Sequence, residues 1–283
     1  MARQAGALNP GITLQGDWRR SAPPFIVPPY HLPQGAAAMF RILLPFLLLL
    51  AAPAVHALGV DELVQKNIDA RGGLAALRAM NSLKTSGRLG FSQGDFSIDL
   101  GYTGYARRDT RLRTELSMQG LSQVTGYAAG DAWIINPFQG RRDPERISAE
   151  DAKDYEIPAD LDGPLVDWRS KGHRVEYLGT EDMDGTLAHK LKISLKNGDT
   201  QYRYLDPDYF LEILVVDQMT RRGIRREIET ELGNYEKVDG VYIPFSQETG
   251  PRGQPRSQKL VIEKAEANVA MDDALFAFPQ VAK

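Results

Sequence analysis

The stretch FSIDLGYT, residues 96–103, decides the fold. Apolar residues in it alternate with polar or small ones, and this period of two is typical of a β-strand with one dry and one wet face. The apolar positions are Phe96, Ile98, Leu100 and Tyr102. The segment follows the turn-like Gln93-Gly94-Asp95, so the alternating segment before that turn is expected to pair with it as a hairpin.

The same alternation extends outward from this hairpin through most of the chain. Asp-Gly and Asn-Gly pairs separate several of the segments, and such pairs between alternating runs are strong hairpin signals. About twelve strands are predicted, at residues 83–91, 96–102, 111–119, 121–129, 131–136, 174–180, 188–195, 200–205, 211–217, 224–235, 241–248 and 257–265. Successive hairpins of this kind predict a mainly β protein with one wide, curved antiparallel sheet.

Two regions show helical rather than strand periodicity. Residues 60–80 carry apolar side chains at helical spacing, but Gly72-Gly73 interrupts them, so either one kinked helix or two helices are expected. Residues 137–172 break the strand pattern, and two short helices split near Pro158 are expected there. Both regions are expected to cover the concave face of the sheet.

The first 57 residues differ from the rest. Residues 1–38 are rich in proline and lack an apolar period, which predicts a disordered or wrongly assigned extension. Residues 39–57 combine Arg41, an apolar run and an Ala-Val-His-Ala end, the pattern of a secretory signal peptide. A membrane anchor behind an N-terminal tail is the alternative, although the apolar run is shorter than the roughly 20 residues that span a bilayer. Residues 58–283 are predicted to form a single domain exported to the periplasm.

Composition and motifs argue against several function classes. The formal net charge is −3, whereas nucleic-acid binding requires clustered positive charge. The sequence has no cysteine, which excludes disulfides, thiolate metal sites and cysteine nucleophiles. No nucleotide, hydrolase or zinc motif occurs, so neither a metal nor a cofactor is predicted. A hydrolase built on His189 is the enzymatic alternative, but a partly buried strand histidine is the simpler interpretation.

A second cluster has two interpretations as well. Arg221, Arg222, Arg225 and Arg226 surround Gly223. They form either the solvated tip of a hairpin or a contact for an acidic partner or a lipid headgroup.

The dry faces of the strands suggest a ligand cavity. Thirteen side chains are predicted to line it: Phe91, Phe96, Ile98, Leu100, Tyr102, Leu112, Leu116, Met118, Trp133, Ile135, Leu191, Ile193 and Tyr204. A wide curved sheet with a small helical cover can leave space inside. The alternative is an ordinary core in which the helices pack against these residues.

Several short motifs resemble those of one family, the outer-membrane lipoprotein-sorting proteins (LolA/LolB-like) with the related LppX-like lipid carriers. The most specific is GDAWIINPF, residues 130–138, similar to the family's D-G-K-x-L-W-x-Y-x-P-x stretch before the lid helices. Further matches lie at residues 105–109, 179–193, 235–244 and 275–279. The resemblance implies an unclosed antiparallel β-barrel of about eleven strands with an α-helical lid. It also implies that Arg108 contacts the lid, although Asp109 stands where the family usually has proline.

The same resemblance implies a function. It suggests a non-enzymatic periplasmic carrier that binds lipid or the acyl chains of a lipoprotein and moves them towards the outer membrane. A monomer is expected, because one concave subunit suffices for this. Its expected partners are an acylated lipoprotein or lipid and an inner-membrane transporter or outer-membrane acceptor. The alternative is a non-enzymatic interaction module of the envelope that docks to a membrane exporter.

Overall fold

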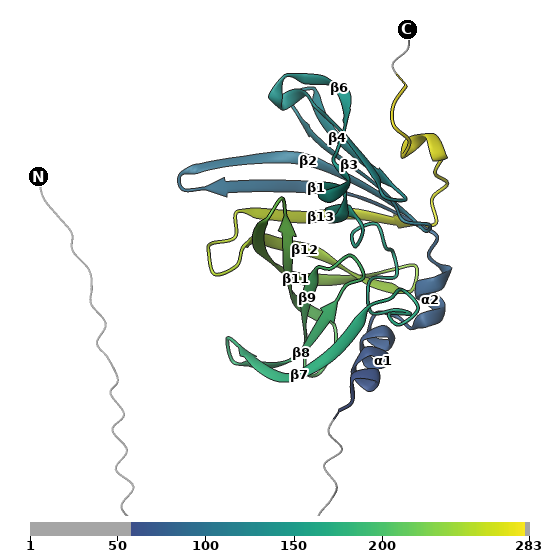
Figure 1. The fold of residues 1–283 in the computed structure, drawn as a ribbon, viewed down its shortest axis with the longest axis vertical. Helices are drawn as coiled ribbons and strands as arrows, with labels where there is room; N and C mark the ends of the chain where they lie inside the picture. Colours follow the sequence, from purple (N-terminus) through teal and green to yellow (C-terminus); the bar gives the residue numbers. More distant parts are fainter. Residues whose placement is uncertain (1–57, 281–283) are drawn as a thin grey trace, which may run out of the picture. The chain divides into compact units, whose positions relative to one another are not determined.

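The computed structural model describes residues 58–280; the predicted extension and signal peptide lie outside the described residues. Thirteen strands form one sheet, and each neighbouring pair is antiparallel (Figure 1). The strands are β1 (Ser82–Gln93), β2 (Phe96–Arg107), β3 (Arg111–Met118), β4 (Leu121–Ala128), β5 (Asp131–Asn136), β6 (Arg141–Arg146), β7 (Arg174–Met183), β8 (Thr186–Ser194), β9 (Thr200–Leu205), β10 (Glu212–Arg221), β11 (Ile224–Val238), β12 (Val241–Pro251) and β13 (Gln258–Ala267).

The strand order shows why the sheet stays open. The chain builds outward from β1 to β6, crosses over, and returns from β7 to β13, which pairs with β1. Strands β6 and β7 therefore form two separate edges. The predicted fold class, a mainly β unclosed antiparallel sheet, is confirmed, with thirteen strands instead of about eleven. All twelve segments predicted from alternation coincide with strands; the additional one is β6.

Strand β6 has no apolar alternation to reveal it. Its sequence is RRDPER, and Pro144 cannot donate a backbone hydrogen bond to a neighbouring strand. Proline is tolerated here because β6 pairs only with β5 and lies at the edge of the sheet. The strand forms because the short 3₁₀ turn Pro137–Gln139 reverses the chain after β5, so that the next residues pair with β5.

Two helices meet at the Gly72-Gly73 pair. Helix α1 (Val60–Ala70) ends before it and α2 (Leu74–Ala79) begins after it. Gly72 has φ of +120°, and a Cβ on it would overlap the carbonyl oxygen of Gly240 in the β11–β12 turn. The glycine pair thus lets the helices dock closely on this turn, where the backbone N–H of Tyr242 donates to the carbonyl of Arg71 at 2.8 Å.

The connection from β6 to β7 is less helical than predicted. Helix α3 (Ala149–Ala152) and the 3₁₀ turn Lys153–Tyr155 account for the first predicted helix, with Ser148 capping the N–H of Asp151. The second predicted helix, after Pro158, is a series of turns. Gly163 adopts a φ of +77° and Pro164 follows it, and both features oppose a continuous helix. We call residues 149–172 the lid segment.

Helices α1 and α2 and part of the lid segment cover one half of the concave face (Figure 1). Their side chains pack against β7, β8 and β9 as the main hydrophobic core. The fully buried members include Leu63, Leu165, Val166, Leu191, Ile193 and Leu205. No helix within residues 58–280 has the length and apolar character needed to cross a membrane.

Candidate functional site

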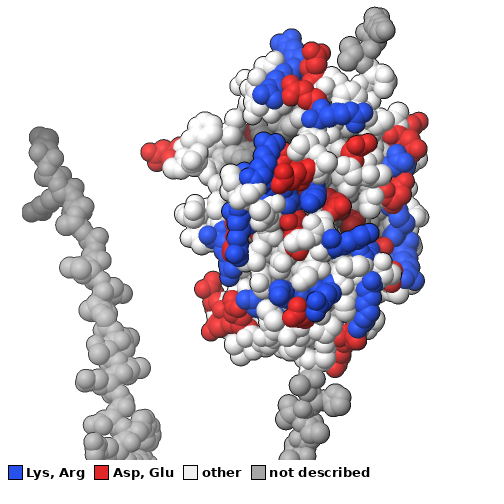
Figure 2. Space-filling view, in the orientation of Figure 1, with Lys and Arg blue, Asp and Glu red and all other residues white. Residues whose placement is uncertain are grey.

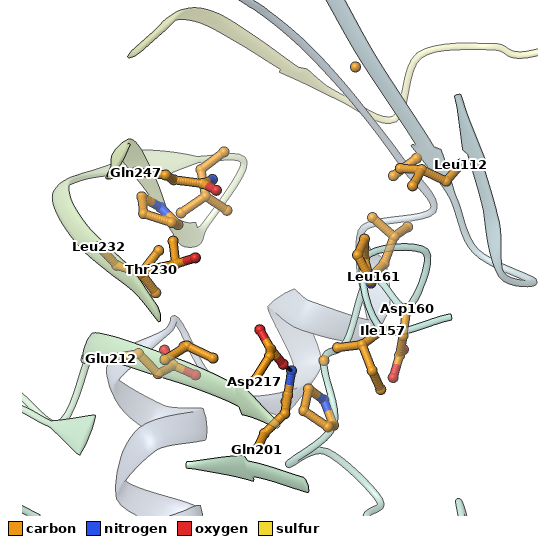
Figure 3. Close-up of a pocket in the computed structure, with 18 of the residues that line it drawn as sticks. Leu112, Ile157, Asp160, Leu161, Gln201, Glu212, Asp217, Thr230, Leu232 and Gln247 are labelled. Carbon is orange, nitrogen blue, oxygen red and sulfur yellow. Dashed lines mark hydrogen bonds between the residues drawn. The ribbon is translucent and has the colours of Figure 1, made fainter. Parts of the chain in front are cut away.

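The other half of the concave face holds a cavity beside a small packed cluster of Tyr127, Ala132, Ala152 and Ala159. A half-open cavity of about 520 Å³ lies between the sheet and the lid segment, with walls from β1–β3 and from β9–β13. This volume falls within the roughly 300–1,000 Å³ of typical small-molecule sites. Figure 3 shows Leu112, Leu161 and Ile157 on one side of the cavity, and Glu212, Asp217 and Gln201 on another.

One wall of the cavity is apolar. Strands β1, β3 and β13 contribute aliphatic side chains to it, and the lid segment contributes further aliphatic side chains. This wall contains Leu83, Leu112, Ile157, Leu161, Leu260 and Ile262. Tyr102 joins it from β2, where burial raises the pKa of its hydroxyl, which hydrogen-bonds Thr85. The phenol is therefore neutral and adds apolar area to this wall.

The facing wall, on β9 and β10, is polar. Arg203 donates to the Glu212 carboxylate at 2.8 Å and to the Gln201 side-chain carbonyl at 3.3 Å. The Gln201 amide donates in turn to Asp217 at 2.5 Å. Glu212 is only 4% exposed, so its charge depends on this pairing. Tyr235 completes the wall by donating to the backbone carbonyl of Glu212 at 2.7 Å.

The two carboxylates of β10 have opposite pKa shifts. Burial alone would raise the pKa of Glu212, but the positive charges of Arg203 and Arg71 hold it below its ordinary value. Burial raises the pKa of Asp217, and the hydrogen bond from Gln201 offsets this only in part. Glu212 is therefore a satisfied member of a charge pair, whereas Asp217 has an incompletely compensated charge that faces the cavity.

Arg108 ties the lid segment to the sheet. It lies just after β2, and its guanidinium binds both carboxylate oxygens of Asp162, at 2.7 and 2.9 Å. The same group donates to the backbone carbonyls of Leu77 and Met80 at the end of α2. The structure thus places the residue predicted to contact the lid against both α2 and the lid segment, a geometry that suits an arginine fork.

A second ion-paired contact holds the first part of the lid segment. Arg221 is only 4% exposed and binds Asp199 at 2.6 Å and Asp154 of the lid segment at 2.8 Å. Arg222 beside it contacts Glu150 and Asp151. Burial raises the pKa of Asp154 against the opposing charge of Arg221. Two of the four clustered arginines therefore bind the protein's own lid segment, an arrangement that neither interpretation of the sequence anticipated.

The structure divides the thirteen predicted cavity residues into three groups. Tyr102 and Leu112 line the cavity. Six more share their face of the sheet, as the β1–β2 and β2–β3 registers show, but lie beyond the cavity towards the hairpin tips: Phe91, Phe96, Ile98, Leu100, Leu116 and Met118. Phe96 is 62% exposed. Leu191 and Ile193 are on the concave face too, but in the packed core.

The remaining three residues correct the prediction, because they point to the convex face. Tyr127 pairs with Leu112, so its side chain lies on the concave face. Gly126 and Val124 are one and three residues away from Tyr127 along β4 and therefore lie on the opposite face. Their partners on β5, Trp133 and Ile135, lie on that face too. A Cβ on Gly126 would overlap the Trp133 ring, which lies flat on the strand and donates to the carbonyl of Phe276 at 3.0 Å. The C-terminal segment, and not a ligand, covers this side chain.

Tyr204 is the third of these residues. It lies opposite Lys190 and stacks beneath its ammonium on the convex face, while Arg203 and Leu191 pair on the concave face. The aromatic residues Tyr202 and Tyr204 made the wrong face of β9 look apolar. The polar wall was missed for the same reason: Gln201 and Arg203 occupy the inward positions. The available signal was the parity that β8 imposes, since Leu191 and Ile193 face inward.

His189 has the surroundings of a structural residue. It hydrogen-bonds the Tyr177 hydroxyl at 2.9 Å and stacks on Phe210 with a centroid distance of 5.7 Å. Burial lowers the pKa of its imidazole. These contacts join β8 to the loop beneath α1. Among residues 58–280, no group of three or more His, Asp or Glu side chains is arranged to hold a metal ion.

Surface charge is evenly distributed on the face shown in Figure 2. Lys and Arg side chains are interleaved with Asp and Glu over the strands and the lid segment. The ion pairs among residues 58–280 include Arg222 with Asp151 and Arg141 with Glu145. A nucleic-acid site needs a continuous basic stripe, and this face does not present one.

Comparison with known proteins supports the fold. No family model and no curated relative matches the sequence. Among solved structures, a DUF1329 family protein from Desulfovibrio piger matches with a TM-score of 0.55 and 13% identity, covering 77% of this chain and 97% of that one. A LolA superfamily protein from Nitrosomonas europaea has a TM-score of 0.55 and 11% identity, with 78% and 98% covered.

A third structure, a putative outer membrane lipoprotein-sorting protein domain from Vibrio parahaemolyticus, has a TM-score of 0.52 and 13% identity, with 76% of this chain and 94% of that one covered. At these identities the likeness concerns the backbone arrangement. All three solved structures share this arrangement over most of the described sheet. The chain therefore has the LolA-like fold.

Proposed function

We propose that this protein is a periplasmic carrier that binds lipid, or the acyl chains of a lipoprotein, in its cavity and moves them towards the outer membrane. The observation that carries the proposal is the apolar wall of the half-open cavity, formed by Leu112, Ile157 and Leu161 with their neighbours. The lipoprotein-sorting description of the Vibrio parahaemolyticus protein of the same fold supports it.

The apolar surface extends beyond the cavity itself. Ile98, Leu116 and Met118 follow it on the same face of the sheet and are half-buried, and Phe91 lies beside Ile98 across the β1–β2 register. An extended chain can therefore continue from the cavity along β1–β3 towards the hairpin tips. This gives five of the six predicted residues outside the cavity a role as a second part of the chain-binding surface, whereas Leu100 is buried.

The energetics of transfer suit a carrier. An acyl chain of about fifteen methylenes loses on the order of 12 kcal/mol when it moves from an apolar cavity to water, at about 0.8 kcal/mol for each methylene. Bound cargo would therefore not escape into the periplasm. Transfer between a bilayer and the cavity joins two apolar phases and is close to balanced, so a carrier needs no hydrolytic chemistry of its own.

The lid segment supplies the point of control. Arg221 holds its first part through Asp154, and Arg108 holds its middle through Asp162. Such pairs are weakened when a partner surface competes for either charge. An inner-membrane transporter could thus favour opening for loading, and an outer-membrane acceptor for release. A monomer has every part of this device, and the predicted signal peptide at residues 39–57 would deliver it to the periplasm.

The direct experiment is extraction of bound molecules from protein purified from the native periplasm, followed by mass spectrometry. We expect acyl lipid in near-stoichiometric amount from the unaltered chain. Leu112→Glu should lower the bound amount by at least tenfold, because even an uncharged polar group buried against methylenes costs on the order of 1–3 kcal/mol and a carboxylate costs more.

Leu178→Glu is the matched control, since Leu178 is an exposed leucine on the edge strand β7, away from the cavity. It should leave the lipid content unchanged. Absence of any acyl molecule from the unaltered protein, together with failure to bind added lipid, would rule out the carrier. The interaction module that docks to a membrane exporter would then be the better proposal.

A further inference from the structure

The cationic groups of the cavity wall are already engaged by the protein. Arg203 binds Glu212 and Gln201, and Arg221 binds Asp199 and Asp154. Arg71 donates to the backbone carbonyl of Asp162 at 2.8 Å. Lys153 also lines the cavity and is exposed to solvent. A carboxylate or phosphate headgroup would thus have to displace an existing pair to find a buried positive partner.

The acceptors of the same wall are not fully used. Asp217 accepts a hydrogen bond from Gln201 through Oδ1, at 2.5 Å, and no ion pair joins it to a cation among residues 58–280. Its second oxygen faces the cavity without a protein donor there, and Figure 3 shows the side chain directed into the same space as Gln201. Burial raises its pKa, as expected for a charge that lacks solvation. A ligand donor would supply the missing hydrogen bond.

We propose that the cavity takes an amphiphile whose polar end donates hydrogen bonds to the Asp217 carboxylate, with its chain against Leu112 and Leu161. A long-chain amine and a lipid with free hydroxyls share this chemistry, whereas a free fatty acid does not. The two requirements come from facing walls of one cavity, so they set the orientation of the ligand: donor at β10, chain towards β3 and the lid segment. This inference depends on the proposed carrier function and specifies its ligand class.

The test compares three probes of equal chain length by displacement of a fluorescent fatty probe at neutral pH: dodecylamine, monododecanoylglycerol and dodecanoate. At least one of the donor-headed probes should bind about tenfold more tightly than dodecanoate, the effect expected of a hydrogen bond to a charged group. Asp217→Asn presents a donor in place of the free acceptor and should remove most of this preference. Binding of the amine alone would identify a cationic head, and binding of both would identify a hydroxylated one as sufficient.

Asp160→Asn is the matched control. Asp160 lines the same cavity, but Lys171 already occupies its carboxylate at 2.5 Å, so the head preference should persist. Thermal unfolding checks that each variant is folded, and Asp217→Ser provides a second substitution at the site. Equal affinity for all three probes, or a preference that Asp217→Asn leaves intact, would overturn the Asp217 site alone. Failure of every probe to bind would instead overturn the carrier function.

Discussion

Both halves of the concave face carry inward apolar side chains, but one half is packed core and the other contains a cavity. Under α1 and α2, side chains from β7–β9 such as Leu191 are fully buried in a continuous core. Beside them, Leu112 and its neighbours on β1–β3 face a cavity of about 520 Å³. An inward apolar residue on this sheet therefore has no single role. The segment that covers it decides whether it packs or lines a site.

Arg203 stands at the boundary between the halves. It pairs across the sheet with Leu191 of the packed half on one side and with Val215 of the cavity wall on the other. Its bond to the buried Glu212 thus separates a dry core from a hollow that can receive a polar group. The cavity is therefore bounded by a charge pair as well as by apolar side chains.

The largest expected effect comes from removing that boundary. Arg203→Met would leave Glu212 buried without its cation and should lower the free energy of unfolding by about 3–5 kcal/mol in urea titrations. The double variant Arg203→Met with Glu212→Leu should recover most of the loss. Arg88→Met, which breaks an exposed pair with Glu263, should cost no more than about 1 kcal/mol. A loss of that small size for Arg203→Met would mean that the pair does not bound the cavity.

Truncation on the two sides of the boundary tests the comparison directly. Leu191→Ala creates a hole in packed core and should cost about 2–5 kcal/mol. Leu112 is only half-buried beside an existing hollow, so Leu112→Ala should cost about 1 kcal/mol, a reduced transfer term with no new cavity. Urea unfolding of both variants gives the difference. Equal losses would show that the half assigned as hollow is packed in solution.

A smaller effect should follow from loosening the lid segment over the hollow half. Arg108→Lys keeps the charge but loses the two-pronged contact with Asp162, and should cost about 1–2 kcal/mol. Hydrogen exchange should increase in the lid segment and not under α1. Arg107→Lys is the control, because Arg107 pairs with the exposed Asp109 and Asp273. Equal exchange in the two variants would argue against a specific role of Arg108 at the lid segment.

The smallest effect concerns pH. Asp217 has a raised pKa and binds protons more tightly in the folded state, so its contribution to stability falls as pH rises from its unfolded pKa through its folded one. Asp217→Asn should remove that fall and raise stability at neutral pH by no more than about 1 kcal/mol. Glu212 has a lowered pKa, so its contribution is lost as pH falls through the folded value.

Urea unfolding at a series of pH values distinguishes the two carboxylates. Glu212→Gln should destabilise the protein at neutral pH, in contrast to Asp217→Asn. Destabilisation by Asp217→Asn at neutral pH would show that its charge is already satisfied by the protein.

Much of the fold could be predicted because it rests on local patterns. The alternating segments, such as the one around Ile98 and Leu100, all form strands, and Gly72-Gly73 marked the meeting of two helices. Strand β6 escaped because both faces of RRDPER are mainly exposed. The turns after Pro158 replaced a helix because Gly163 and Pro164 oppose helical backbone angles.

The site was harder to predict, since it depends on which face of each strand turns inward. Trp133 and Tyr204 are large and apolar, yet they lie on the convex face, covered by the C-terminal segment and by Lys190. Gln201 and Arg203 occupy inward positions despite their polarity, because Leu191 and Ile193 on the neighbouring strand set the register. Hydrophobicity alone therefore assigns these residues to the wrong faces of the sheet.

The open antiparallel sheet follows from local sequence, because a period of two and short polar turns act within a few residues of each other. The division of one face into core and cavity does not follow from local sequence. That division depends on where α1, α2 and the lid segment come to rest, and these positions are held by contacts between residues far apart in the chain, such as Arg108 with Asp162 and Arg221 with Asp154. Local sequence patterns do not predict such long-range pairs.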